Sequence, residues 1–147
     1  MNGPYSALIL VTGSRSWDDV ATIHNALLEA WHDALQDGHC GITVMHGGAP
    51  GADLIAGAWA HDRETLGVTA EQIDADWATC ADTCNPGHRR TRDDYSWCPT
   101  AGHRRNQHMV DAEPVVVLAF QRGQSTGTAD CLHRAETARL AIRRWTK

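Results

Sequence analysis

The fold of this chain is decided by residues 7–15, ALILVTGSR, in which an apolar strand runs directly into a glycine turn. Residues 42–53, ITVMHGGAPGAD, repeat this arrangement. A helical pattern follows each turn, so in a parallel sheet both turns would lie at the carboxyl ends of the strands, where open α/β sheets bind ligands. Glycine lets backbone N–H groups approach an anion, and the following helix N-terminus adds partial positive charge. The two stretches therefore predict a nucleotide-like ligand.

The apolar pattern of the remaining chain alternates between helices and strands. Apolar residues spaced three and four apart predict helices over residues 17–35, 52–66, 101–110 and 129–143. Ser16 and Asp18 lie near the expected N-cap of the first of these helices. Two more strands are expected over residues 68–75 and 114–120, and the second is a continuous apolar run typical of a buried parallel strand. These successive units predict an α/β fold with a mostly parallel, doubly wound sheet in one domain over residues 1–147.

The composition narrows the class of protein. With 147 residues and 42% hydrophobic content, the chain is long enough to bury one ordinary core. It shows neither an apolar run of membrane-spanning length nor the start of a signal peptide, so we expect a cytoplasmic protein without a membrane partner. The formal net charge is −5, yet residues 84–108 hold five arginines against two aspartates. This distribution disfavours general nucleic-acid binding and predicts local attraction of a compact anion.

Residues 77–103 form a polar insertion that is rich in metal-binding residue types: Cys80, Cys84, His88, Cys98 and His103. Thiolates and imidazoles suit a closed tetrahedral zinc site, and a metal would supply folding free energy that so polar a segment lacks. We expect a structural zinc bound by four of the five residues, with either Cys80 or His103 as the fourth ligand. The alternative is a mobile loop with free thiols, because the spacing departs from the usual Cys-x2-Cys pairs.

Four motifs together resemble one known family. They are residues 11–17 (VTGSRSW) with Asp19, residues 46–53 (HGGAPGAD), residues 101–106 (AGHRRN) with Met109 and Val110, and residues 126–128 (TGT). In this order they resemble the YspA-like, cpYpsA-related branch of the SLOG superfamily, which also contains the LOG phosphoribohydrolases and the DNA-uptake protein DprA. The resemblance implies a Rossmann-like, three-layer α/β/α fold and a nucleotide or ADP-ribose-like ligand. It also implies an actinobacterial or phage source, hence a bacterial or phage-infected host cell, and a homodimer.

The resemblance assigns the first ligand turn to Gly13, Ser14 and Arg15. The Arg15 guanidinium would contact a phosphate or carboxylate in bidentate geometry. The alternative for Arg15 is a surface ion pair with Asp18 or Asp19, a common but weak interaction.

Further ligand contacts implied by the resemblance fall on Gly47, Gly48, Gly51, Asp53, Arg105, Asn106, Ser125, Thr126, Gly127 and Thr128. The glycine loop would hold phosphate or ribose through backbone N–H groups, and Asp53 would either cap the following helix or accept a ribose hydroxyl. Arg105 would supply charge and Asn106 orientation from the start of a helix, unless this pair only holds the insertion in place. Residues 125–128 would add a third anion contact at a helix N-terminus.

The chain departs from the LOG hydrolases at their catalytic glutamate. Cys131 stands at that position and Asp130 is one residue away, which on a helix is a rotation of about 100°. We therefore expect a protein that binds a nucleotide or nucleotide-derived small molecule. Two alternatives stay open: hydrolysis of an N-glycosidic or phosphate bond, for which the catalytic residue is unknown, and single-stranded nucleic-acid binding as in DprA.

Overall fold

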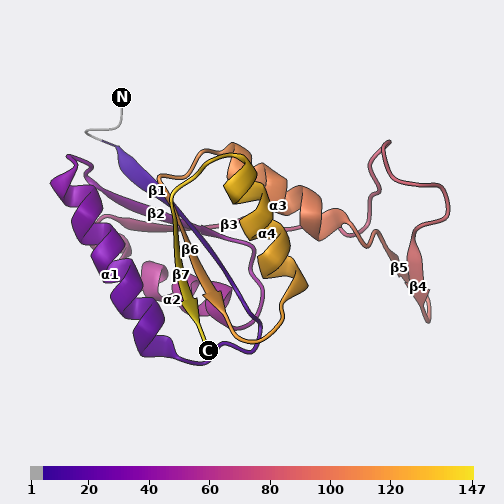
Figure 1. The fold of residues 1–147 in the computed structure, drawn as a ribbon, viewed down its shortest axis with the longest axis horizontal. Helices are drawn as coiled ribbons and strands as arrows, with labels where there is room; N and C mark the ends of the chain where they lie inside the picture. Colours follow the sequence, from indigo (N-terminus) through magenta and orange to yellow (C-terminus); the bar gives the residue numbers. More distant parts are fainter. Residues whose placement is uncertain (1–4) are drawn as a thin grey trace.

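A parallel five-stranded sheet forms the centre of the protein, whose computed structural model describes residues 5–147 (Figure 1). The first apolar run forms β1 (Ser6–Gly13), which pairs with β2 (Gly41–His46) on one side and β6 (Val116–Gln121) on the other. The outer strands are β3 (Val68–Gln72) and β7 (Ile142–Thr146), so the order is β3-β2-β1-β6-β7 and every pairing is parallel. The predicted α/β fold with a mostly parallel, doubly wound sheet is confirmed.

Helices cover both faces of the sheet, as buried parallel strands require. They are α1 (Val20–Gln36), α2 (Ala52–His61), α3 (Ala101–Asp111) and α4 (Thr126–Thr137), with a short 3-10 helix, Glu64–Leu66, after α2. Residues of α1 and α2 share one buried apolar cluster with the sheet, and residues of α3 and α4 share a second cluster. The result is the three-layer α/β/α arrangement. Among the helices of residues 5–147, none has the length and apolar character needed to cross a lipid bilayer.

The N-cap of α1 is Asp19, one residue beyond the predicted Asp18. Its carboxylate accepts hydrogen bonds from Thr22 N at 3.2 Å and from Thr22 Oγ1 at 2.7 Å, which satisfies the start of the helix. The ammonium group of Lys147 lies 2.6 Å from Asp19 Oδ2. The hydrogen bonds from Lys147 and Thr22 lower the pKa of Asp19 to about 2, so this carboxylate is committed to the helix start and the C-terminus.

The predicted helix over residues 129–143 is wrong at its C-terminal end. Helix α4 ends at Thr137, Arg139 adopts a left-handed φ of 61°, and the chain then forms strand β7. The ring of Trp145 stacks on Phe120 of the neighbouring strand, with centroids 4.9 Å apart and planes at 13°. This contact between distant parts of the chain stabilises the edge strand, in which Ile142, Trp145 and Thr146 are residue types that favour strands.

The insertion between β3 and α3 carries a small antiparallel hairpin of β4 (Arg90–Arg92) and β5 (Tyr95–Trp97). Figure 1 shows the hairpin beyond the N-terminal end of α3, directed away from the main sheet. Only the base of the insertion reaches the carboxyl edge of the sheet.

Candidate functional site

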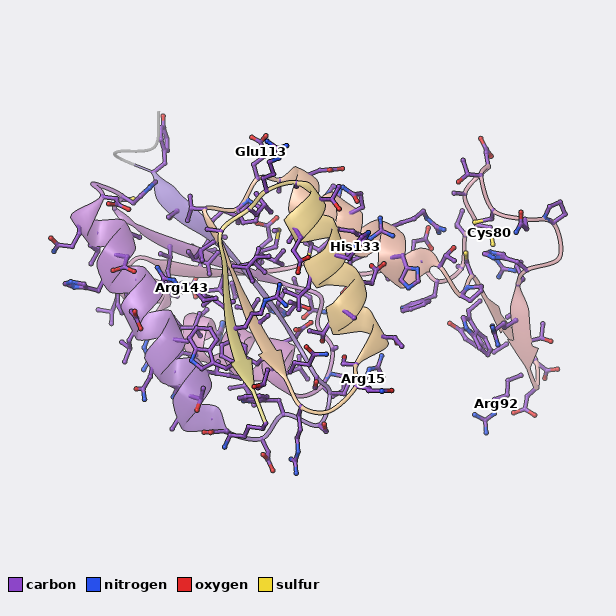
Figure 2. The ribbon with its side chains drawn as sticks, viewed as in Figure 1. Arg15, Cys80, Arg92, Glu113, His133 and Arg143 are labelled. Atoms are coloured by element: carbon purple, nitrogen blue, oxygen red, sulfur yellow. The ribbon has the colours of Figure 1, made fainter. Side chains whose placement is uncertain are left out.

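The loops at the carboxyl edge of the sheet enclose a cleft of about 630 Å³. Its walls are the turn after β1, Asp53 at the start of α2, the first two turns of α3 and residues 124–128 at the start of α4. Figure 2 shows Arg15 beside the loop that leads into α4. A cleft of this size and place suits a small-molecule ligand, because open α/β sheets bind ligands at this edge and such sites commonly measure 300–1,000 Å³.

Ten of the predicted ligand residues line the cleft: Gly13, Ser14, Arg15, Asp53, Arg105, Asn106, Ser125, Thr126, Gly127 and Thr128. Gly47, Gly48 and Gly51 do not line it. The amide of Gly47 donates to Asp53 Oδ2 at 3.0 Å, and the amide of Gly48 donates to His46 Nδ1 at 3.0 Å. These N–H groups serve the loop itself.

Gly51 packs directly against the backbone of the first ligand turn. Its φ is +81°, and a Cβ atom there would lie 2.4 Å from the carbonyl oxygen of Ser14. A Cβ atom at Gly13 would similarly lie 2.5 Å from Cβ of Ala52. The two glycines therefore let the start of α2 pack directly under the β1 turn, which sets the depth of the cleft.

Asp53 is a buried carboxylate with one unused oxygen. Its residue is 6% exposed, and Oδ2 accepts hydrogen bonds from Gly47 N at 3.0 Å and Ala49 N at 3.3 Å. Within residues 5–147, Oδ1 has no hydrogen-bond partner. Burial raises the pKa of Asp53 to about 6, although the two amides and the charges of Arg105 and Arg15 act in the opposite direction. The N-cap of α2 is Gly51, so Asp53 fastens its own loop instead of capping the helix.

Arg15 is exposed on the cleft wall and makes no ion pair within the described part of the chain. The two aspartates that were alternative partners are engaged elsewhere. Asp18 pairs with Arg122 at 3.3 Å, and Asp19 pairs with Lys147. The Arg15 guanidinium is therefore available to an anionic ligand.

Arg105 and Asn106 lie in the second turn of α3, not at its start, and they join three elements across the cleft. Arg105 Nη1 donates to the carbonyl oxygen of Gly47 at 2.9 Å, and its Nε donates to Asn106 Oδ1 at 3.0 Å. Asn106 Nδ2 donates to Gly127 O at 3.3 Å and to Asp130 Oδ2 at 3.0 Å. This network fixes the β2 loop, α3 and α4 relative to one another.

The first turn of α4 faces the cleft with its N-terminal amides. Ser125 is the N-cap, and its hydroxyl accepts a hydrogen bond from Thr128 N at 3.4 Å. The first amides of a helix have no partner within the helix, so those of Thr126 and Gly127 are suited to an anion. The hydroxyl of Ser14 is less available, because it accepts a hydrogen bond from Arg122 N at 2.8 Å and joins the ends of β1 and β6.

The residues near the LOG glutamate position are unsuited to that role. Cys131 is fully buried, and burial raises the pKa of its thiol to about 11. Burial alone would also raise the pKa of Asp130, but hydrogen bonds from Arg134 and Asn106 lower it. Asp130 is thereby held as an ionised structural partner of Arg134, whose Nε lies 2.9 Å away.

Sequence reasoning missed Trp77 and His103 as residues of the cleft, and both line it. Trp77 follows β3, whose carboxyl end lies at the same edge as those of β1 and β2, so its place after a strand was an available signal. His103 was a candidate metal ligand. It lies outside the group of cysteines and histidine that the structure brings together.

That group consists of Cys80, Cys84, His88 and Cys98, whose ligand atoms all lie within 4.8 Å of one another. His88 Nε2 is 3.2 Å from the sulfurs of both Cys80 and Cys98, and the sulfurs of Cys84 and Cys98 are 3.9 Å apart. Tetrahedral zinc with sulfur and nitrogen ligands needs separations of about 3.5–3.8 Å between ligand atoms. The cluster therefore fits a metal ion of this kind. Figure 2 shows Cys80 beside other sulfur atoms at the root of the hairpin.

Two arginines surround the cluster. Arg104 Nη1 lies 3.4 Å from the sulfur of Cys98 and 3.6 Å from that of Cys84, while Arg89 Nη1 lies 3.7 Å from that of Cys80. Burial alone would raise the pKa of Cys98, but hydrogen bonds from Thr100 and Arg104 lower it to about 5. The surroundings thus favour the thiolate at Cys98, the form that binds metals. At Cys80 burial and the hydrogen bond with Cys98 raise the pKa of the thiol instead.

The fold and cleft define a Rossmann-like α/β protein with a ligand cleft at the carboxyl edge of a parallel sheet. The family model described as YspA, cpYpsA-related SLOG family (YAcAr) matches residues 8–79. The Gene 61 protein of Mycobacterium phage D29 is 38% identical over 136 residues, which cover 91% of this chain and 92% of that protein. The chain therefore belongs to the YspA, cpYpsA-related SLOG family. The phage relative also supports the predicted phage source.

A solved structure shares the fold. The X-ray structure of TM1055 is similar with a TM-score of 0.54 and 16% identity, covering 92% of this chain and 72% of that chain. The C-terminal domain of the PF1911 hydrogenase from Pyrococcus furiosus matches with a TM-score of 0.42 and 12% identity, covering 98% of this chain and 95% of that chain. The first of these likenesses agrees with the Rossmann-like architecture.

Proposed function

We propose that the protein binds a nucleotide-derived small molecule that carries phosphate and ribose. The observation that carries this proposal is the meeting of Arg15, the first turn of α4 and Asp53 in one cleft. The first two suit a phosphate group, since a free guanidinium and open helix amides both favour negative charge. Asp53 suits a different part of the ligand.

The free Oδ1 atom of Asp53 needs a hydrogen-bond donor. A phosphate oxygen cannot supply one at neutral pH, whereas a ribose hydroxyl donates readily, as in dinucleotide sites where a carboxylate binds the ribose. A buried acceptor left without a partner costs free energy, so a ligand hydroxyl at this point would gain affinity. The cleft thus combines hydrogen-bond donors for a phosphate with one buried carboxylate oxygen that can accept a hydrogen bond from a ribose hydroxyl.

Substitution of Arg15 tests the phosphate contact. We expect Arg15→Ala to weaken binding of ADP-ribose by about 10- to 100-fold in calorimetric titration, because a charged hydrogen bond contributes about 1.5–3 kcal/mol. The melting temperature should change little, since Arg15 makes no ion pair in residues 5–147. Arg139→Gln is the matched control: it removes one exposed arginine from the turn between α4 and β7. Equal affinity of the wild type and Arg15→Ala would contradict the proposal.

Binding accounts for the cleft better than LOG-like hydrolysis. The position of the LOG glutamate holds a buried thiol, and the adjacent Asp130 is bound by Asn106 and Arg134. Mass spectrometry of NAD, ADP-ribose and AMP after incubation with the protein is the test. Unchanged compounds would support a binding role, and the appearance of free base or ribose 5-phosphate would contradict it.

We further propose that the four clustered residues bind one structural zinc ion. A Cys3His set suits zinc, and the bound ion would order a segment that has few apolar contacts of its own. Native mass spectrometry should find one zinc per chain in the wild type and in His103→Ala, and none in Cys80→Ser. Zinc retained by Cys80→Ser but lost from His103→Ala would contradict this ligand set. The same spectra give the subunit number and so test the expected homodimer.

All five cysteines are free, and three of them belong to this cluster. Thiols persist in reducing compartments, which is the basis for proposing the cytoplasm of a bacterial or phage-infected cell as the location of the protein. Fractionation of cells that express the chain would test it.

A further inference from the structure

A second hollow of about 500 Å³ lies next to the cleft, on the hairpin of the insertion. Its walls are Trp77, Arg92, Asp93, Tyr95 and Trp97. Trp77 lines both the hollow and the cleft, so the two adjoin at this residue. The motifs that resemble the SLOG family do not include any of these five residues.

One face of the hairpin combines aromatic and cationic side chains. Arg90 is paired with Trp97, and Arg92 with Tyr95. Directly opposite residues of an antiparallel pair share one face, and so do alternate residues of one strand. All four side chains therefore lie on the same face of the hairpin, two aromatic and two cationic.

The two aromatic rings on this face are stacked, and Tyr95 is open to solvent whereas Trp97 is half-buried. The ring centroids of Tyr95 and Trp97 are 5.7 Å apart and the ring planes meet at 17°. Tyr95 is 59% exposed and Trp77 is 38% exposed, which is unusual for such large side chains. A planar, electron-rich surface beside a guanidinium suits a nucleobase, because every base offers a π face and arginine adds a cation–π contribution.

Hydrogen bonds beside the Cys3His cluster hold this surface in place. Cys98 directly follows Trp97, and its amide donates to the carbonyl oxygen of Trp77 at 2.7 Å. Arg89 donates to Ala78 O at 2.8 Å and to Ser96 Oγ at 2.9 Å, which joins the segment after Trp77 to the hairpin. These hydrogen bonds therefore hold Trp77, Tyr95 and Trp97 in place next to the Cys3His cluster.

We propose that Trp77, Tyr95, Trp97 and Arg92 form a base-binding subsite for the same ligand whose phosphate and ribose occupy the cleft. The inference rests on the proposed function and extends it to a class of ligand: a nucleoside diphosphate derivative, long enough to reach from the α4 N-terminus past Trp77 to the hairpin. Asp93 on the rim of the subsite offers an acceptor for an exocyclic amine of the base.

The experiment compares two probes, ADP-ribose, which carries a base, and ribose 5-phosphate, which does not. Affinities are measured by calorimetry for the wild type, Tyr95→Ala, Trp97→Ala and the control Tyr5→Ala, a tyrosine with the same 59% exposure outside the insertion. Base stacking on one aromatic ring predicts about 5- to 100-fold weaker binding of ADP-ribose by Tyr95→Ala and Trp97→Ala. Affinity for ribose 5-phosphate should stay within about twofold in all variants, and Tyr5→Ala should match the wild type for both probes.

The outcomes separate this inference from the function on which it rests. If the wild type binds both probes and the hairpin variants bind them equally well, the base subsite is wrong and the cleft assignment stands. If the wild type binds neither probe, both fall. An oligothymidylate is titrated as a third probe: if the hairpin variants lose affinity only for it, the surface serves single-stranded DNA and the inference is overturned. Zinc content measured on each variant establishes that Trp97→Ala, which adjoins Cys98, retains the cluster.

Discussion

The side chains of the cleft divide into those that hold the structure and those left with bonding capacity. Arg105 donates a hydrogen bond to Gly47, and Asn106 donates hydrogen bonds to Gly127 and Asp130. Arg15 and one oxygen of Asp53 remain unpaired within residues 5–147. A protein that needed only stability would not bury a carboxylate with a free oxygen, because desolvation of a charged group opposes folding.

Substitution of Asp53 by asparagine separates the effect of this carboxylate on stability from its effect on ligand binding. The folded state raises the pKa of Asp53 from its ordinary value of 3.8 to about 6, so the folded state holds the proton more tightly than the unfolded state does. The free energy of unfolding should therefore fall as pH rises from about 4 to about 6, by roughly 1–3 kcal/mol from this group. Asp53→Asn should lose that slope in urea titrations and equal or exceed wild-type stability at pH 7.5.

The same variant should bind ligand less well, since an amide oxygen used by Gly47 and Ala49 leaves an NH2 group in place of the acceptor Oδ1. We expect affinity for ribose 5-phosphate to fall about 10-fold in calorimetry at pH 7.5. Unchanged affinity would mean that Asp53 Oδ1 does not contact the ligand, even where the stability result holds.

At the scale of secondary structure, the sequence predicted the elements that a continuous local pattern of residues determines. Long apolar runs gave β1, β2 and β6 together with the turns after them, and the cysteine and histidine spacing predicted the cluster, although not whether Cys80 or His103 belongs to it. The turn amides of Gly47 and Gly48 were expected to face ligand, but the loop uses them internally. Which amides remain free depends on contacts that only the folded chain makes.

Three further strands escaped prediction because distant contacts stabilise them. The three-residue strands β4 and β5 are too short for an apolar alternation to be visible, and their order depends on contacts around the cluster. Strand β7 was predicted as the end of a helix. Its strand conformation depends on pairing with β6 and on the stack between Trp145 and Phe120, two residues 25 positions apart in the sequence.

Removal of the Trp145 ring tests that account of β7. Trp145→Ala deletes a half-buried ring stacked on a fully buried Phe120, so we expect the free energy of unfolding to fall by about 2–3 kcal/mol. Trp97→Ala removes the same side chain from the hairpin and should change it by less than about 0.5 kcal/mol, since the main sheet does not include that residue. Urea unfolding followed by circular dichroism measures both, and equal losses would contradict the separation of hairpin from sheet.

The whole molecule combines a body stabilised by two apolar clusters with an insertion joined by polar contacts around the Cys3His cluster. The body buries residues of all four α-helices against the sheet. The insertion contributes exposed strands, arginines and the Cys3His cluster, and Figure 1 shows it projecting beyond α3. The two parts should therefore respond differently to loss of metal, because bound metal acts on folding only where its ligands are ordered by it.

Metal removal is the test at this scale. After treatment with a chelator, we expect trypsin to cleave rapidly at Arg89, Arg90 and Arg92, which the ordered hairpin otherwise protects. The two resulting fragments should stay associated, because β1 to β3 lie on one side of the cleavage sites and β6 and β7 on the other, joined by the β1–β6 pairing. Size-exclusion chromatography and circular dichroism of the cleaved protein measure this. The variant Cys40→Ser, which alters an exposed thiol outside the cluster, should behave as the wild type in the presence and absence of chelator. If chelation instead unfolds the main sheet, the metal supports the whole molecule, and the division into an independent body and a metal-ordered insertion is wrong.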